Sequence, residues 1–228
     1  MNLPVNEIFS SVQGEGSYTG TPAVFVRLQF CAVGCPWCDS KHTWKKNDLD
    51  KISFDEMLVK TADASTWADV EEWRLIDYLM KQPEELIVIT GGEPCNYDLT
   101  ELTASLLSKG KQPQIETSGT ADIKAHHKTF ITLSPKIDMP GGLQVLTPAV
   151  CLADEIKMPV GKIADVEKLK EFINQYPSVK NSIEAKMRPK VYLQPLSQSE
   201  KATELCIEQA RLNGWRLSAQ LHKYLKVR

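Results

Sequence analysis

The chain of 228 residues contains no apolar run long enough to cross a bilayer, and it does not begin with the charged and apolar regions of a secretory signal. It also carries no large excess of charge of either sign. The net charge is −2 with 25% charged residues, whereas a general nucleic-acid binder should carry a basic face. Internal repeats and low-complexity segments are absent. We therefore expect a cytoplasmic protein that binds neither membranes nor nucleic acid directly.

The most informative feature is a loop with three cysteines, Cys31, Cys35 and Cys38, in a C-x3-C-x2-C spacing. In a reducing compartment, clustered cysteines indicate metal binding or catalysis more often than disulfides. A closed structural metal site uses four protein ligands. Three thiolates on a four-iron cluster would instead leave one iron open for another ligand. A zinc site that adds His42 is the alternative. The scattered Cys151 and Cys206 are interpreted as small buried hydrophobes.

Apolar segments typical of buried strands alternate with amphipathic helical segments along the chain. Alternation of this kind predicts a mainly parallel sheet with helices outside it, and 228 residues suit a single α/β domain. One helix is expected to start near Asp98 and to stop near Gly110. The predicted strands are 23–30, 86–90, 114–117, 129–133, 154–158, 190–194 and 216–219.

Small and polar residues follow most of these strands at their carboxyl ends. In α/β barrels and open α/β sheets, active sites gather at this edge. Two glycines after a strand also let the backbone approach a ligand closely. The segments in question are Gly91-Gly92-Glu93-Pro94, Ser118-Gly119, Ser134-Pro135-Lys136, Gln194-Pro195 and the region of Gln220 and His222.

The cysteine loop followed by Gly91-Gly92-Glu93-Pro94 resembles the radical S-adenosylmethionine superfamily. A narrower resemblance, spread from residue 6 to residue 224, is to the 7-carboxy-7-deazaguanine synthase family. The segments that carry it are Gln13-Gly14-Glu15-Gly16, Phe25-Val26-Arg27-Leu28, the run from Cys38 to Trp44, the run from Ile115 to Thr120, Ser134-Pro135-Lys136 and the run from Gln220 to Tyr224.

The resemblance implies an α/β fold, namely a shortened, partly open radical-enzyme (β/α) barrel with mainly parallel strands. It implies one domain over residues 1–228. The polar stretch 45–73 is interpreted as an insertion that covers or flanks the cluster, because shorter relatives have less sequence there. Members of the family are typically homodimers.

The resemblance also implies the cofactors. Cys31, Cys35 and Cys38 would hold a [4Fe–4S] cluster whose open iron binds S-adenosylmethionine, the source of a 5′-deoxyadenosyl radical. A hydroxyl after the last cysteine, here Ser40, would hold Mg²⁺, and an electron donor such as flavodoxin would reduce the cluster. Residues expected to contact S-adenosylmethionine are Trp37, Cys38, Asp39, Gly92, Glu93, Ser134, Pro135 and Lys136.

The implied reaction is radical ring contraction of 6-carboxy-5,6,7,8-tetrahydropterin to 7-carboxy-7-deazaguanine with release of ammonia, in queuosine and 7-deazaguanine biosynthesis. This is the reaction of a carbon–nitrogen lyase. Arg27 suits a charge-assisted contact to the substrate carboxylate, although on a strand it could also face solvent. The residues expected to bind substrate are Val12, Gln13, Gly14, Glu15, Arg27, Thr90, Gln194 and His222.

Two other functions remain open at this point. A small radical activase that acts on a partner protein would share the cysteine loop, but it would leave Gln13, Arg27 and His222 without a small-molecule role. A zinc-binding structural or adaptor protein would contain zinc and no iron. Metal content and reaction products distinguish the three.

Overall fold

The computed structural model describes residues 1–227, and these residues form one sheet of nine strands. The strand order is β3-β1-β2-β4-β5-β6-β7-β8-β9. β1 is antiparallel to both of its neighbours, and every pair from β2 to β9 is parallel. Their bounds are β1 (Asn2–Val12), β2 (Pro22–Leu28), β3 (Ala68–Glu71), β4 (Leu86–Gly91), β5 (Gln112–Thr117), β6 (Phe130–Leu133), β7 (Glu155–Val160), β8 (Lys190–Pro195) and β9 (Arg216–Leu217).

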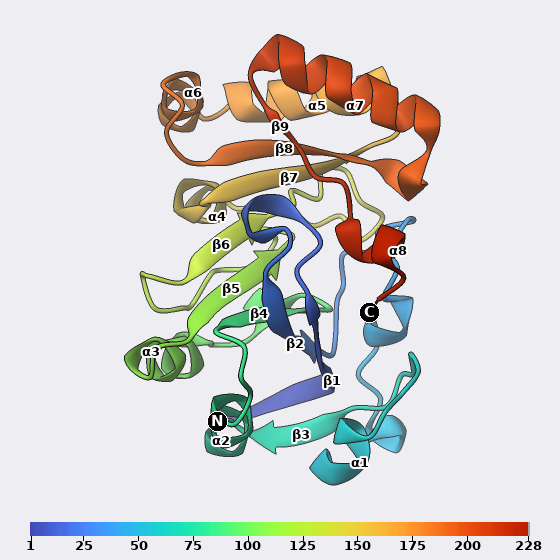
Figure 1. Ribbon diagram of the computed structural model, residues 1–228, viewed down its shortest axis with the longest axis vertical. Helices are drawn as coiled ribbons and strands as arrows, with labels where there is room; N and C mark the ends of the chain where they lie inside the picture. Colours follow the sequence, from blue (N-terminus) through green and yellow to red (C-terminus); the bar gives the residue numbers. More distant parts are fainter. Residues whose placement is uncertain (228) are drawn as a thin grey trace.

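The sheet curves but does not close, because β3 and β9 are its two edges. Most helices lie along its outer side, while α8 lies on the opposite side (Figure 1). The prediction of a partly open, mainly parallel α/β barrel is therefore confirmed. The helices are α1 (Phe54–Leu58), α2 (Glu72–Met80), α3 (Thr100–Ser108), α4 (Thr147–Leu152), α5 (Ile163–Asn174), α6 (Pro177–Glu184), α7 (Glu200–Asn213) and α8 (Leu221–Leu225).

All seven predicted strands are present, with small differences at their ends. The first ends at Leu28, and Phe30 already has a positive φ of 85°. The last is shorter than predicted and ends at Leu217. The helix expected between Asp98 and Gly110 is α3, and the Asp98 carboxylate accepts a hydrogen bond from the Thr100 N–H at 3.0 Å.

β1 and β3 were not among the predicted strands. Polar Asn6 and Glu7 interrupt the apolar pattern of β1, yet both are buried, at 0% and 2% exposed. Internal partners replace water for both side chains. Asn6 Nδ2 donates to Gln29 Oε1 at 2.8 Å, and Arg27 Nε donates to Glu7 Oε1 at 2.6 Å. Buried polar groups are tolerated when they are hydrogen-bonded in this way.

The stretch 45–73 contains α1 and β3 and reaches the first residues of α2; β3 pairs with β1 at the edge of the sheet. Gln29 Nε2 donates to the carbonyls of Lys45 at 2.6 Å and Ser65 at 3.3 Å. Lys60 Nζ donates to the Asn6 carbonyl at 2.9 Å. The stretch is thus fastened to β1 and to the end of β2. Its status as an insertion stays a prediction.

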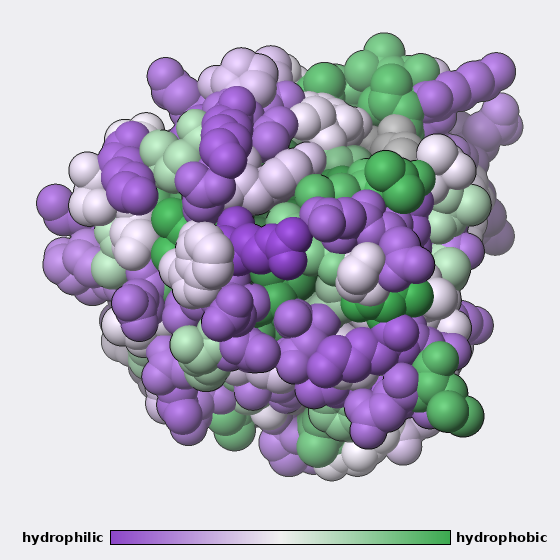
Figure 2. Space-filling model, turned by 90° about the horizontal axis from the view of Figure 1, so that it is seen from below, coloured by the Kyte–Doolittle hydropathy of each residue, from purple (hydrophilic) through white to green (hydrophobic). Residues whose placement is uncertain are grey.

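The face seen in Figure 2 is largely hydrophilic, with apolar residues in separate small patches. Exposed apolar side chains do occur, among them Leu49, Val59 and Trp73. Within residues 1–227, no helix is both long and apolar enough to cross a membrane.

Two of the scattered cysteines differ from one another. Cys206 is buried, as predicted, inside the cluster of apolar side chains under α5 and α7. The same prediction for Cys151 is wrong, because this residue lies near the end of the short helix α4 and is exposed.

Candidate active site

A cavity of about 540 Å³ lies at the carboxyl edge of the parallel strands, as the polar segments there predicted. The three cysteines line it together with nearly all of the other predicted site residues. These are Val12, Gln13, Glu15, Arg27, Trp37, Asp39, Ser40, Thr90, Gly92, Glu93, Ser134, Lys136, Gln194 and His222. Gly14 and Pro135 are the two predicted residues that do not line it.

The cysteine loop forms one wall of the cavity. Cys31, Cys35 and Cys38 are all free thiols, and the Cys38 N–H donates to the Cys35 carbonyl at 3.0 Å, which folds the loop back on itself. Burial raises the pKa of Cys31 to about 11 and also raises the pKa of Cys35. These two thiols are therefore protonated at neutral pH until a metal displaces the protons.

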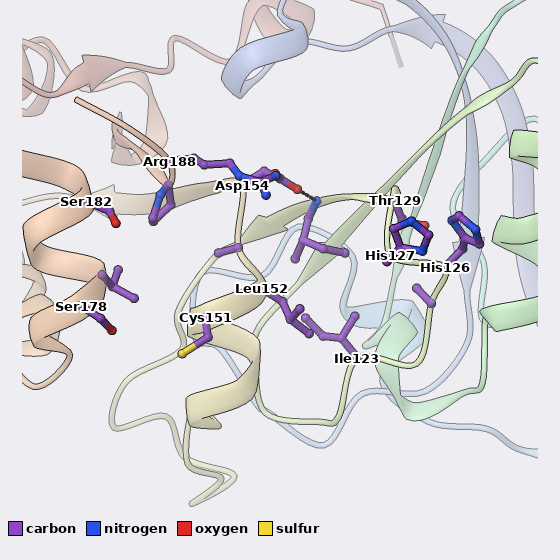
Figure 3. A pocket seen from close by; sticks show the side chains of 15 residues that line it. Ile123, His126, His127, Thr129, Cys151, Leu152, Asp154, Ser178, Ser182 and Arg188 are labelled. Carbon is purple, nitrogen blue, oxygen red and sulfur yellow. Dashed lines mark hydrogen bonds and ion pairs between the residues drawn. The ribbon is translucent and has the colours of Figure 1, made fainter. Parts of the chain in front are cut away.

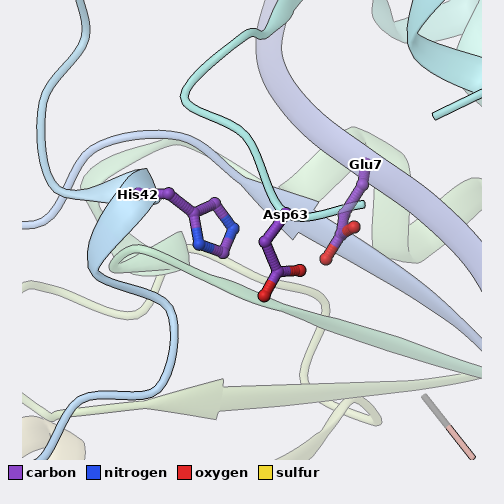
Figure 4. Close-up of side chains that lie close together, drawn as sticks. All are labelled: Glu7, His42 and Asp63. Atoms are coloured by element: carbon purple, nitrogen blue, oxygen red, sulfur yellow. The ribbon is translucent and has the colours of Figure 1, made fainter. Parts of the chain in front are cut away.

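The spacing of ligands argues against a single zinc ion on this loop. Among the described residues, only Glu7, His42 and Asp63 bring three metal-ligating side chains within 4.8 Å of one another (Figure 4). His42, the fourth ligand of the zinc alternative, lies in that group. The three cysteine sulfurs therefore do not all lie as close together as ligands of one zinc ion. A four-iron cluster spaces its thiolates more widely than one ion does, so the cysteine loop fits a cluster better than zinc.

The group of Glu7, His42 and Asp63 is a polar part of the cavity wall (Figure 4). Burial lowers the pKa of His42, and the Arg27 and Lys60 cations act in the same direction. Arg27 Nε also donates to Glu7. Arg27 thus pairs with Glu7, while the Asp63 and Glu7 carboxylates oppose the lowering of the His42 pKa. Arg27 itself faces the cavity and not solvent.

The turn after β4 brings the chain against the end of β2. A Cβ on Gly92 would lie 2.1 Å from the Phe30 carbonyl oxygen, and one on Gly91, whose φ is +120°, would lie 2.2 Å from the Leu28 nitrogen. The Glu93 N–H donates to the Phe30 carbonyl at 2.8 Å. Both glycines are thus required because the turn packs closely against the backbone of residues 28–30, directly before Cys31.

The Glu93 carboxylate is 2% exposed and already accepts four hydrogen bonds. The Cys95 N–H and the Thr117 hydroxyl donate to Oε1 at 3.0 and 2.6 Å. The N–H of Ser118 donates to Oε2 at 2.8 Å, and its hydroxyl donates to the same oxygen. Glu93 therefore connects the carboxyl ends of β4 and β5 and fixes this side of the cavity.

Another part of the lining is a buried charged group that centres on Lys157. Its ammonium pairs with Glu15 and, at 3.1 Å, with Glu116. Burial alone would raise the pKa of Glu15, but Lys157 outweighs it and lowers the pKa to about 2. Gln13 Nε2 donates to Glu116 Oε1 at 3.0 Å, and Gln220 Nε2 donates to Glu15 Oε1 at 2.9 Å.

Lys157 and Glu116 were not among the predicted site residues. Both lie inside strands that were predicted correctly, β7 and β5. The available signal was a charged side chain within a predicted buried strand, next to an apolar residue such as Ile115 or Met158. Such a residue needs a buried partner or a functional site.

The carboxyl-terminal segment completes the cavity. The Leu221 N–H donates to the Gly14 carbonyl at 2.8 Å, and a Cβ on Gly14 would lie 2.2 Å from His222 Nδ1. Gly14 is therefore needed for the seating of α8. Burial lowers the pKa of His222, which is thus neutral at pH 7.

Ser40 and Lys136 lie near the cysteines. Ser40 precedes the short 3-10 helix Lys41–Thr43, but its side chain makes no capping hydrogen bond. The hydroxyl lies 3.6 Å from Cys38 Sγ. Lys136 Nζ donates to Ser134 Oγ at 2.7 Å, and burial lowers its pKa. Gln194 Oε1 accepts from the Ser218 hydroxyl at 3.2 Å.

A second cavity, of about 280 Å³, lies at the opposite ends of the strands, where Thr129 and Asp154 precede β6 and β7 (Figure 3). His126 and His127, which were interpreted as loop residues, line it with Arg188. Arg188 pairs with Asp154, whose other carboxylate oxygen accepts from the Ile131 N–H at 2.9 Å. This cavity contains none of the predicted site residues.

Comparisons with known proteins agree with this site. A family model described as a 4Fe-4S single cluster domain matches residues 12–123, which include the cysteine loop. The chain is 44% identical over 229 residues to 7-carboxy-7-deazaguanine synthase from Escherichia coli (strain K12), with all of both chains covered. It is also 44% identical over 230 residues to the synthase of the same name from Buchnera aphidicola subsp. Schizaphis graminum, again with full coverage.

Among solved structures, the crystal structure of QueE from Escherichia coli matches with a TM-score of 0.88 and 42% sequence identity. The match covers 97% of this chain and 95% of that chain. Sequence and fold therefore agree over the full length. The chain belongs to the 7-carboxy-7-deazaguanine synthase family, a group of radical S-adenosylmethionine enzymes with a [4Fe–4S] cluster.

Proposed function

We propose that this protein converts 6-carboxy-5,6,7,8-tetrahydropterin to 7-carboxy-7-deazaguanine with loss of ammonia, and so acts as a carbon–nitrogen lyase in queuosine and 7-deazaguanine biosynthesis. One observation carries the proposal. The cysteine loop and the buried charged group of Lys157, Glu15 and Glu116 line the same cavity. A radical activase would not need such a built polar wall, because its target is a protein segment. The full-length identity to named synthases supports the same conclusion.

The cavity would hold both small molecules. Cys31, Cys35 and Cys38 would ligate the [4Fe–4S] cluster, which supplies, with S-adenosylmethionine, the radical that starts the reaction. The residues proposed to hold S-adenosylmethionine are Trp37, Cys38, Asp39, Gly92, Glu93, Ser134, Pro135 and Lys136. Since the Glu93 carboxylate already accepts four hydrogen bonds, its main contribution is to keep this wall in place.

The charged group would orient the pterin. Lys157 keeps Glu15 ionised, so the Glu15 carboxylate can accept hydrogen bonds from N–H groups of the substrate. Arg27 would donate to the substrate carboxylate through the part of its guanidinium that Glu7 leaves available. Neutral His222 can donate from one ring nitrogen and accept at the other. The full proposed substrate set is Val12, Gln13, Gly14, Glu15, Arg27, Thr90, Gln194 and His222, with Gly14 acting through its support of His222.

Ser40 would contribute one oxygen ligand to Mg²⁺, with water and substrate oxygens as the others. Its hydroxyl caps no helix, which supports this role. The proposal further includes a single domain, a homodimer, a cytoplasmic location and an electron donor of the flavodoxin class. The single sheet that runs through residues 1–227 supports the first of these. Resemblance to the family supports the others.

An anaerobic turnover assay tests the proposal. Reconstituted protein receives S-adenosylmethionine, Mg²⁺, dithionite and 6-carboxytetrahydropterin, and the products are identified by mass spectrometry. We expect 7-carboxy-7-deazaguanine from the wild-type chain and none from Cys31→Ala. Glu15→Gln should keep its iron and bind substrate more weakly. If 5′-deoxyadenosine forms without the deazaguanine, the substrate assignment is wrong and the activase is favoured.

A further inference from the structure

Trp44 contacts the cysteine loop at both of its ends. Its indole Nε1–H donates to Cys38 Sγ at 3.3 Å, and its backbone carbonyl accepts from the Cys31 N–H at 3.2 Å. The ring is half-buried in the wall of the cavity. The Lys41 ammonium lies 5.8 Å from the ring centroid. No role proposed so far requires an N–H donor at this position.

An indole N–H can only donate, and in a buried place it normally finds a carbonyl or another oxygen acceptor. Trp67 shows this ordinary pattern, because its Nε1–H donates to the Asn47 carbonyl at 2.8 Å. Trp44 instead donates to the sulfur of a cysteine that would ligate the cluster. Hydrogen bonds to cluster sulfurs are one of the factors that set the reduction potential of an iron–sulfur site.

We propose that Trp44 raises the reduction potential of the [4Fe–4S] cluster by donating its indole N–H to the Cys38 thiolate. This inference rests on the proposed function, since it needs the cluster. In the reduction step, one electron passes from a low-potential one-electron donor, dithionite in the test below, to the cluster, and all three thiolates stay deprotonated. The added negative charge spreads onto the sulfurs, where the N–H dipole stabilises it. The reduced state therefore gains more from the hydrogen bond than the oxidised state does.

The backbone geometry makes the side-chain effect separable from folding. The Cys31–Trp44 contact uses the backbone carbonyl, and the Phe30 N–H donates to the neighbouring Thr43 carbonyl at 2.7 Å. Both bonds persist when only the side chain at position 44 changes. Trp44→Phe keeps an aromatic ring there and removes the donor. Trp73→Phe makes the same change at an exposed position of α2 and serves as the matched control.

The experiment is an anaerobic redox titration followed by electron paramagnetic resonance, on reconstituted wild-type, Trp44→Phe and Trp73→Phe proteins of measured iron and sulfide content. We expect a more negative midpoint potential for Trp44→Phe and an unchanged one for Trp73→Phe. A Trp44→Phe protein with a full cluster and the wild-type potential would overturn the inference. A wild-type protein that assembles no four-iron cluster would instead refute the proposed function.

A second measurement needs no substitution, in case Trp44→Phe retains no cluster. Wild-type protein is grown with ¹⁵N-indole tryptophan, reduced without S-adenosylmethionine and examined by pulsed electron paramagnetic resonance. A hydrogen bond from Trp44 to a ligating sulfur predicts a ¹⁵N hyperfine coupling to the cluster spin. The same coupling should remain in Trp37→Phe, which removes the other labelled indole that lines the cavity. Its absence from the wild-type spectrum would overturn the inference.

Discussion

Replacing Lys157 by methionine should destabilise the protein strongly, because the change removes the cation between two carboxylates. The lysine is 4% exposed, and the side chains of Glu15 and Glu116 are 14% and 22% exposed. Lowering the Glu15 pKa from 4.5 to about 2 corresponds to about 3 kcal/mol. Removing one partner of a buried ion pair typically costs about 3–5 kcal/mol. Both values give an expected loss in the free energy of unfolding of about 3 kcal/mol.

Thermal unfolding of the reconstituted protein, followed by circular dichroism, measures this effect. For a chain of this size, about 3 kcal/mol corresponds to a fall of roughly 6–12 °C in Tm. Lys168→Met is the control, because Lys168 and its partner Asp138 are exposed at 41% and 73% and such pairs contribute about 0–1 kcal/mol. If both variants melt within about 2 °C of each other, the interpretation of Lys157 as a buried charge partner is wrong.

Three further predictions follow from the same structure. Gly92→Ala should prevent stable cluster retention, because its Cβ would lie 2.1 Å from the Phe30 carbonyl oxygen; iron and sulfide analysis after reconstitution measures this. Gln29→Leu should remove the bonds to the Lys45 and Ser65 carbonyls and the buried bond to Asn6, the last at about 1–3 kcal/mol, and speed limited proteolysis between residues 45 and 66. The Tm gap between wild type and Lys157→Met should widen as pH rises from 5 to 8. In the wild type the Glu15 contribution is present above pH 4.5 and is lost only as pH falls through about 2. In the variant, burial is the largest remaining influence and outweighs the Gln220 hydrogen bond, so it raises the Glu15 pKa and makes stability fall as pH rises.

Each of these predictions has a control or a contrary result. Gly161→Ala places its Cβ at an ordinary 3.4 Å from Leu196 and should leave the iron content unchanged. Equal iron in Gly92→Ala would contradict the packing argument. Proteolysis of Gln29→Leu at the wild-type rate would show that other contacts hold the stretch 45–73. A Tm gap that narrows with rising pH would mean that Glu15 is not the group that loses its partner.

The parallel part of the fold was predictable because most of its strands, such as β2, β4 and β6, are short apolar segments followed by polar residues. This pattern reports burial directly, and the family resemblance placed the strands in a partly open barrel. β1 was not predictable in the same way. Asn6 and Glu7 are polar residues whose buried partners, Gln29 and Arg27, lie 23 and 20 positions further along the chain. A local pattern contains no information about such distant partners.

The candidate site shows the same limit. The cysteine spacing and the glycine turn are local signals, and both were found. Lys157 gained its role only when folding brought Glu15, 142 positions earlier, into contact with it. Gly14 was expected to contact substrate because it belongs to a recognised motif. Its position in the fold also gives it a structural task, the seating of α8.

The docking of α8 on Gly14 has a consequence for how the protein is made. Gln220 lies 205 positions after Glu15, so at about 5–20 residues per second a ribosome needs roughly 10–40 s to synthesise the chain between them. During that time the cysteine loop has already emerged, while the wall that carries His222 does not yet exist. The part of the cavity wall that α8 supplies is therefore the last part of the site to form.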